Sequence, residues 1–200
     1  MIVKILFNIV GILLFFFLFW KKLKEDYDSE SIFTFAVFIV AGVGIFSFVS
    51  LKLLPQWWFW ADCLGATLGF LLGRLKFKFR FFESLEAATI GLLPWLSFIF
   101  LQDSISNTSL PTLLAFIVLL LVIAFYVFLD AHYKKLTWYK SGKVGFSGLT
   151  TLGILFLIRT AVAAGFPSML SFLGPIDSII SGVIAFTSFL LVFNLSRQQT

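Results

Sequence analysis

The chain has 200 residues, of which 60% are hydrophobic and only 12% are charged, and its mean hydropathy is +1.04. A composition this apolar excludes a soluble globular domain, because most side chains have to face lipid or other apolar helices. The formal net charge is +5, but the basic residues lie mainly at the ends of apolar segments. They therefore indicate loops on one side of a membrane, and no nucleic-acid partner is expected.

Seven apolar segments follow one another along the chain, each near the length of about 20 residues that crosses the hydrocarbon core of a bilayer. They cover residues 5–20, 32–54, 57–72, 85–101, 113–129, 146–164 and 176–194. These runs are continuous, whereas the strands of a membrane barrel are shorter and alternate. We therefore predict an all-α fold: a polytopic membrane helix bundle with seven transmembrane helices, forming a single integral membrane domain over residues 1–200.

The basic residues alternate between the two sides of these segments. Twelve of the fifteen follow the first, third, fifth or seventh segment: Lys21, Lys22, Lys24, Arg74, Lys76, Lys78, Arg80, Lys134, Lys135, Lys140, Lys143 and Arg197. Short loops rich in Lys and Arg stay on the cytoplasmic side of a membrane. The N-terminus is therefore expected outside and the C-terminus in the cytoplasm.

The third segment carries a small residue at every fourth position, namely Ala61, Gly65, Gly69 and Gly73. On a helix this spacing forms one stripe, which lets the backbone of a neighbouring membrane helix approach closely. Such a stripe usually serves packing alone. We expect the helix over residues 57–72 to lie at the centre of the bundle.

Basic and apolar residues alternate directly after this helix, over residues 74–82. The basic members are Arg74, Lys76, Lys78 and Arg80, and the aromatic members are Phe77, Phe79, Phe81 and Phe82. Rings at the membrane boundary with charges turned to the headgroups are typical of an interfacial loop. The same alternation also binds nucleic-acid bases, a reading that carries little weight beside a bilayer.

Asp62 and Arg159 are the candidate site residues, because a charge inside a membrane helix is costly and marks function by default. Each lies about five residues from the outer end of its helix, so a rise of roughly 1.5 Å per residue gives both a similar depth. We hypothesise that they face the bundle interior and pair with each other. Two readings are open: a purely structural ion pair, or a guanidinium that binds a lipid phosphate.

Other catalytic signatures are missing from the sequence. It holds no nucleophilic triad and no Gly-rich phosphate loop. His132 is the only histidine, and a metal site needs partners that the chain does not supply. No metal ion and no cofactor are expected.

Short motifs recur in a fixed order along nearly the whole chain: residues 11–17, 30–33, 41–44, 64–66, 80–87, 111–112 and 141–146, followed by Arg159. In this order they resemble the bacterial prolipoprotein diacylglyceryl transferase family, which has seven helices and an outer N-terminus. The resemblance implies an enzyme of the cytoplasmic (inner) membrane of a prokaryote. It implies transfer of diacylglyceryl from phosphatidylglycerol to the cysteine thiol of a prolipoprotein lipobox peptide. Arg159 would bind the lipid phosphate, and Asp62 would be the catalytic base for the thiol.

The chain departs from the family at several polar positions. Trp60-Ala61-Asp62 stands in place of His-Gly-Gly, residues 99–103 in place of Gly-Arg-x-Gly-Asn-Phe, Leu110 in place of a histidine and Ala163 in place of a glutamate. The alternative is therefore a catalytically degenerate relative that binds lipid or a membrane partner. A small-solute transporter, which needs broken helices and a polar site at the midplane, fits less well.

Overall fold

The computed structural model describes residues 2–135, 139, 144–165 and 175–197. Within these ranges the chain contains no strand and seven long α-helices: α1 (Ile2–Leu23), α2 (Ser29–Leu53), α3 (Trp58–Phe77), α4 (Phe81–Asn107), α5 (Leu110–His132), α6 (Phe146–Gly165) and α7 (Pro175–Arg197). Short 3-10 turns, Pro55–Trp57 and Tyr133–Lys135, follow α2 and α5. Each predicted apolar segment falls on one of these helices, so the all-α class is confirmed.

Six of the seven helices in the described ranges are long and apolar enough to cross a membrane. The chain therefore fits a multi-pass membrane protein. The exception is α3, where three glycines, two tryptophans, Asp62 and Arg74 interrupt the aliphatic residues. Glycine adds no apolar side chain, so a helix built for close packing is less hydrophobic than one built to face lipid.

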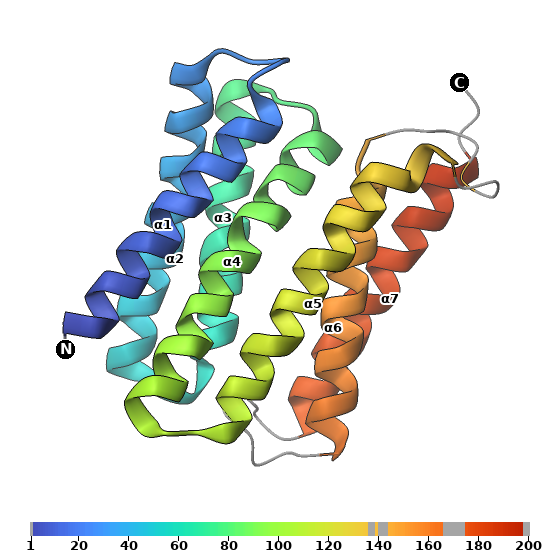
Figure 1. Ribbon diagram of the computed structural model, residues 1–200. Helices are drawn as coiled ribbons and strands as arrows, with labels where there is room; N and C mark the ends of the chain where they lie inside the picture. The colour runs from blue at the N-terminus through green and yellow to red at the C-terminus, as the bar shows by residue number, and fades with distance from the viewer. Residues whose placement is uncertain (1, 136–138, 140–143, 166–174, 198–200) are drawn as a thin grey trace.

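Consecutive helices run antiparallel, as Figure 1 shows, with α1 to α4 in one half of the bundle and α5 to α7 in the other. The helices α1, α3, α5 and α7 finish at the same end, which we call the basic end. Its described basic residues are Lys21, Lys22, Lys24, Arg74, Lys76, Lys78, Arg80, Lys134, Lys135 and Arg197. Lys140 and Lys143 lie outside the described residues. The other end, where α2, α4 and α6 finish, we call the opposite end.

The central helix of the bundle is α4. It packs against α1, α5 and α6, and twelve of its 27 residues are buried, against six of the 20 in α3. By contrast, α3 packs almost entirely against α2. The expectation that the third helix lies at the centre was therefore wrong, because its glycine stripe serves one close neighbour.

The small residues of α3 meet α2 at backbone distance, as predicted. A Cβ atom added to Gly65 would lie 2.7 Å from the carbonyl carbon of Gly42, and one added to Gly69 would lie 2.8 Å from Cα of Ile39. Real Cβ atoms do not approach backbone atoms this closely. The stripe therefore fixes α2 against α3 and turns the remaining faces of α3 toward other parts of the molecule.

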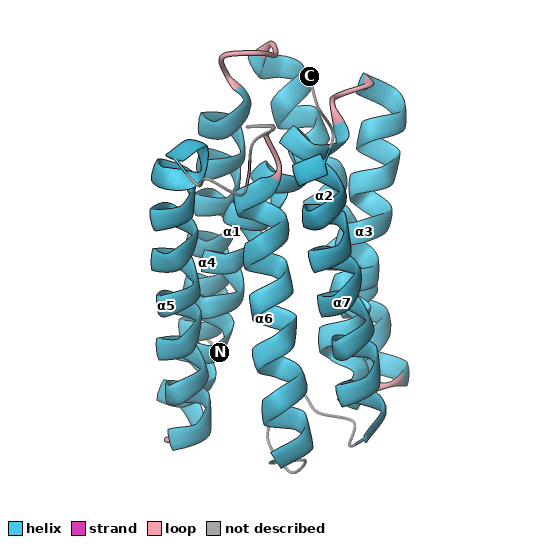
Figure 2. Cartoon of the chain, turned by 90° about the vertical axis from the view of Figure 1, so that its right-hand side faces the viewer, coloured by secondary structure: helices cyan, strands magenta, loops and turns pink. Residues whose placement is uncertain are grey.

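In the second half of the bundle, α6 lies between α5 and α7, and Figure 2 shows the three helices side by side. The contact between α6 and α7 is extensive, whereas α3 and α4 touch only slightly. Space is thus left between the α2–α3 pair, α4 and the α6–α7 pair. The candidate site lies there.

Candidate functional site

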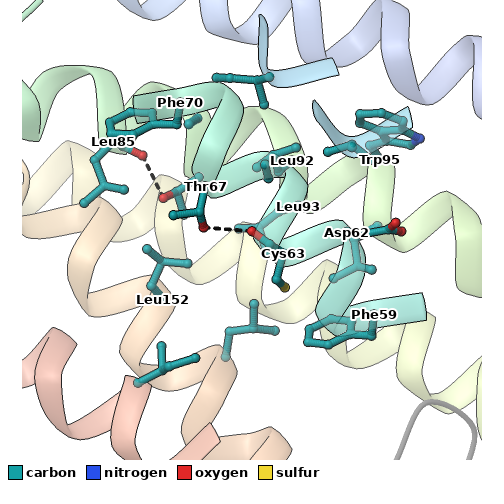
Figure 3. A pocket seen from close by; sticks show the side chains of 18 of the residues that line it. Phe59, Asp62, Cys63, Thr67, Phe70, Leu85, Leu92, Leu93, Trp95 and Leu152 are labelled. Atoms are coloured by element: carbon teal, nitrogen blue, oxygen red, sulfur yellow. Dashed lines mark hydrogen bonds between the residues drawn. The ribbon is translucent and has the colours of Figure 1, made fainter. Parts of the chain in front are cut away.

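A cavity of about 510 Å³ lies between α2, α3, α4, α6 and α7. Aliphatic and aromatic side chains make up nearly all of its wall, and the few polar side chains on it are Asp62, Cys63, Thr67 and Thr89 (Figure 3). Thr89 and Thr67 each donate to a carbonyl oxygen one turn earlier in their own helix. The volume is in the range of roughly 300–1,000 Å³ that is usual for small-molecule pockets.

One face of α3 forms a side of the cavity. Its members are Phe59, Asp62, Cys63, Ala66, Thr67, Phe70 and Leu71, and steps of three and four residues place them on the same side of a helix. Thr67 and Leu71 line the cavity and are nevertheless exposed, Leu71 by 41%. The cavity therefore opens sideways beside α3.

Asp62 lies in this wall, next to Cys63 and one turn after Phe59, as Figure 3 shows. Its carboxylate accepts a hydrogen bond from the hydroxyl of Ser47 on α2. The Asp62 side chain is half-buried, and the following residue, Cys63, carries the single thiol of the chain. The candidate residue Asp62 thus lies in the cavity wall, and its role as a base stays a prediction.

Arg159 lies in a second cluster at the opposite end of the bundle. Its Nη2 is 2.8 Å from Oδ1 of Asp177 on α7, and Trp60 Nε1 donates to the same oxygen at 3.0 Å. The guanidinium also lies over the ring of Phe59, 3.7 Å from its centroid. Arg159 is 8% exposed and Asp177 is fully buried, so this ion pair is shielded from water and lipid.

The hypothesis that Arg159 pairs with Asp62 was wrong. The rings of Phe59 and Trp60 are the side chains of α3 that contact the guanidinium, and the carboxylate that pairs with Arg159 comes from α7. Asp177 could have been suspected from sequence, because it begins the helix that follows Arg159 and antiparallel neighbours bring such positions together. A lipid phosphate at Arg159 would have to compete with Asp177.

A second buried ionic network, which sequence analysis missed, lies toward the basic end. Lys22 Nζ is 2.8 Å from Oε1 of Glu86 and 2.7 Å from Oδ1 of Asp130. Tyr126 donates its hydroxyl to Glu86 Oε1 at 3.3 Å, and the backbone N–H of Gly145 donates to Oε2 at 2.7 Å. Glu86 is only 2% exposed, and it joins α1, α4, α5 and the start of α6.

Gly145 can make this contact because of its backbone. Its φ is +110°, a conformation that glycine adopts without steric cost. Gly145 and Phe146 close the 141–146 motif, and the rest of that motif except Val144 lies outside the described residues. No signal in one sequence links Glu86 to Lys22 and Asp130, since each charge also fits a helix end in isolation.

Comparison of the chain with protein-family models, with curated proteins and with solved structures finds no match. The resemblance to the diacylglyceryl transferases thus depends on the sequence motifs alone. Among the described residues, no group of three or more His, Cys, Asp or Glu side chains is placed to hold a metal ion.

Proposed function

We propose that the chain is a polytopic membrane protein that binds a phospholipid by taking an acyl chain into the cavity beside α3. The observation that carries this proposal is an apolar cavity of about 510 Å³ with a sideways opening. A water-soluble ligand needs several converging polar groups to fix its orientation. An acyl chain needs an apolar wall and a lateral path from the bilayer, and both are features of this cavity.

Transfer of an acyl chain from bulk lipid into the cavity gains little from the hydrophobic effect, because both environments are apolar. Affinity must then come from close packing against rings such as Phe59 and Phe70 and from contacts to the headgroup. The apolar cavity therefore selects the acyl chain as the part of the lipid that is bound, and polar groups near the ends of the cavity set the affinity.

The proposal includes seven membrane crossings, with the N-terminus outside and the C-terminus in the cytoplasm. All described loops with several basic residues lie at the basic end, and basic loops stay in the cytoplasm. Although α3 is less hydrophobic than its neighbours, it runs alongside α2 for most of its length. The cytoplasmic membrane of a prokaryote, which the resemblance of the sequence motifs implies, is the location we propose.

Native mass spectrometry of the purified protein tests the lipid proposal. The variant Thr67→Trp places an indole at the opening of the cavity, and Leu64→Trp is its control. Leu64 lies one turn away on α3, is 56% exposed and is not part of the cavity wall. We expect bound phospholipid on the wild type and on Leu64→Trp, and its loss from Thr67→Trp. Equal lipid occupancy in all three proteins contradicts the proposal.

Cysteine labelling tests the topology independently. In a Cys63→Ser background, Lys78→Cys reports on the basic end and Thr108→Cys on the turn between α4 and α5. A membrane-impermeant maleimide added to intact cells is expected to label only position 108. Labelling of position 78 alone would show that the orientation is the reverse of the one proposed. Labelling of both positions would show that α4, which lies between them, does not cross the membrane.

The second candidate function is diacylglyceryl transfer from phosphatidylglycerol to a lipobox cysteine. The observation that favours it is a carboxylate, Asp62, in the wall of a cavity suited to an acyl chain. In this reaction Asp62 would take the proton of the thiol, the sulfur would attack the glyceryl carbon, and the carbon–oxygen bond to phosphate would break. The products are a thioether and glycerol phosphate. The pairing of Arg159 with Asp177 makes this the second choice.

Reconstitution with phosphatidylglycerol and a lipobox peptide decides between the two. The transferase requires a diacylglyceryl mass shift on the peptide that Asp62→Asn abolishes. The control is an enzyme that carries the full family motifs and is assayed alongside. If that enzyme modifies the peptide and this protein does not, the transferase function is rejected while lipid binding can still be measured.

A further inference from the structure

Arg74 lies about one turn of α3 beyond the last α3 residue of the cavity wall, toward the basic end. It follows Phe70 and Leu71 by four and three residues and Thr67 by seven, so all four share one face of α3. Its guanidinium is 5.3 Å from the ring centroid of Phe81, which is itself part of the wall. The face of α3 that lines the cavity therefore ends in a cation.

This cation has no acidic neighbour in the described part of the chain. Lys22 pairs with Glu86 and Asp130, Arg80 with Glu83 and Arg159 with Asp177, whereas no described carboxylate lies within 4.0 Å of Arg74. The Nε of Arg74 is buried and has no hydrogen-bond acceptor among the described residues. A buried donor of this kind costs free energy until an acceptor is supplied.

The distances fit a phospholipid lying along α3. From Arg74 back to Cys63 there are eleven residues, or roughly 16 Å of helix, about half of the hydrocarbon thickness of about 30 Å. If the phosphate of a lipid binds at Arg74, the acyl chain of that lipid can extend along the cavity wall for about the depth of one leaflet. The planar guanidinium also offers two parallel N–H groups to phosphate oxygens.

We propose that Arg74 binds the phosphate of an anionic phospholipid whose acyl chain occupies the cavity. This inference rests on the lipid-binding function proposed above and adds the headgroup contact that it requires. The surrounding charge is complementary, because Lys78, whose backbone N–H donates to the carbonyl oxygen of Arg74, lies at the same end and attracts anionic lipid. The headgroup of the bound lipid belongs to the leaflet at the basic end, whereas Asp62 lies in the cavity wall toward the opposite end.

The test measures binding of two lipids with identical chains, phosphatidylglycerol and diacylglycerol, to purified wild-type, Arg74→Gln and Lys76→Gln proteins. Lys76 carries the same charge, but its Nζ lies 5.4 Å from the ring centroid of Phe38 on the α2 side. We expect Arg74→Gln to bind phosphatidylglycerol about tenfold more weakly, because hydrogen bonds to a charged partner are lost. Diacylglycerol, which has no phosphate, is expected to bind to Arg74→Gln as it does to the wild type. Lys76→Gln is expected to change either affinity by less than about fivefold.

Three results overturn the proposal: unchanged binding of phosphatidylglycerol by Arg74→Gln, an equal loss in Lys76→Gln, or displacement of the lipid by excess glycerol phosphate. The last result would identify a site for free phosphate.

Arg74→Lys, which keeps the charge but not the two parallel donors, is expected to bind phosphatidylglycerol with intermediate affinity. This variant keeps the test valid if Arg74→Gln misfolds. If Thr67→Trp blocks both lipids while Arg74→Gln blocks neither, only the headgroup contact is refuted. If Thr67→Trp blocks neither lipid, the acyl-chain site itself fails.

Discussion

Arg159 of α6 and Asp177 of α7 lie 2.8 Å apart, and the carboxylate also accepts a hydrogen bond from Trp60 of α3. The pair therefore ties the α6–α7 hairpin to the start of the helix that forms the cavity wall. Because both side chains are buried, it acts as a fixed structural contact at the opposite end of the bundle.

Removal of one partner should be far more damaging than removal of both. Arg159→Leu is expected to lower the free energy of unfolding by about 3–5 kcal/mol, because the buried Asp177 carboxylate loses its guanidinium. The double change with Asp177→Leu should recover most of that loss. The measurement is unfolding in mild detergent with increasing denaturant. If the double variant loses as much unfolding free energy as the two single variants together, the two residues are not coupled. Exchanging the charges of Asp62 and Arg159 is not expected to restore stability, because these two residues do not pair.

The two glutamates at the start of α4 offer a matched comparison. Glu86 accepts three contacts and is buried, so Glu86→Ala should destabilise the bundle by about 3–5 kcal/mol. Tyr126→Phe removes a single hydrogen bond to Glu86 and should cost about 1 kcal/mol. Glu83→Ala should cost less than Glu86→Ala, since one of its partners, Arg80, is 76% exposed and the other, Tyr27, donates a single hydrogen bond. Equal melting temperatures for Glu86→Ala and Glu83→Ala would refute the ranking.

The contact between α2 and α3 predicts opposite outcomes at two glycines. Gly65→Ala places a methyl group against the backbone of Gly42 and should cost about 1–3 kcal/mol through overpacking. A Cβ added to Gly44 meets nothing within 4 Å, so Gly44→Ala should stabilise its helix by about 0.5–1 kcal/mol. Thermal unfolding of the two variants beside the wild type measures both effects. A stabilised Gly65→Ala protein would show that the helices are not in backbone contact.

A pH dependence is expected at the start of α2. The Asp28 carboxylate accepts the backbone N–H of Ser31 at 2.8 Å, and this hydrogen bond lowers the pKa of Asp28 below its usual value. Because the pKa is lower in the folded chain, the carboxylate stabilises the fold above the unfolded pKa of about 3.9. This stabilisation is lost as pH falls through the lower folded value.

Asparagine also caps helices but does not titrate in this range. Between about pH 4 and pH 2, where carboxylates take up protons, the melting temperature of the wild type should therefore fall more steeply than that of Asp28→Asn. Thermal melts of both proteins across that range provide the measurement. Parallel curves for the two proteins would exclude a contribution from the Asp28 carboxylate.

The helices could be predicted because membrane insertion leaves a direct mark on sequence. Segments of about 20 apolar residues are required by the thickness of the bilayer alone. The stripe of small residues from Ala61 to Gly73 predicted that α3 packs closely against a neighbouring helix. The same stripe did not identify the central helix. Backbone contact requires small residues on one face, whereas a central helix such as α4 is recognised by burial on all of its faces.

The site was less accessible to sequence reasoning, because its contacts join helices that are distant in the chain. Asp62 was found from its charge. The partner of Arg159, however, depended on α6 lying against α7, and the rings that α3 places against Arg159 are those of Phe59 and Trp60. Arg74 was assigned to an interfacial loop, although its spacing from Thr67 and Phe70 already placed it on their face of α3. The sequence could not predict the cavity that this face of α3 lines, because the other walls of the cavity come from helices distant in the chain.

Photo-crosslinking with phosphatidylglycerol that carries a diazirine in one acyl chain tests the central claim most directly. The account predicts labels on enclosed wall residues of α4, Ala88 and Leu92, and their loss in Thr67→Trp but not in Leu64→Trp. Labels confined to outward-facing residues such as Leu121 and Phe186, with the same pattern in all three proteins, would contradict it.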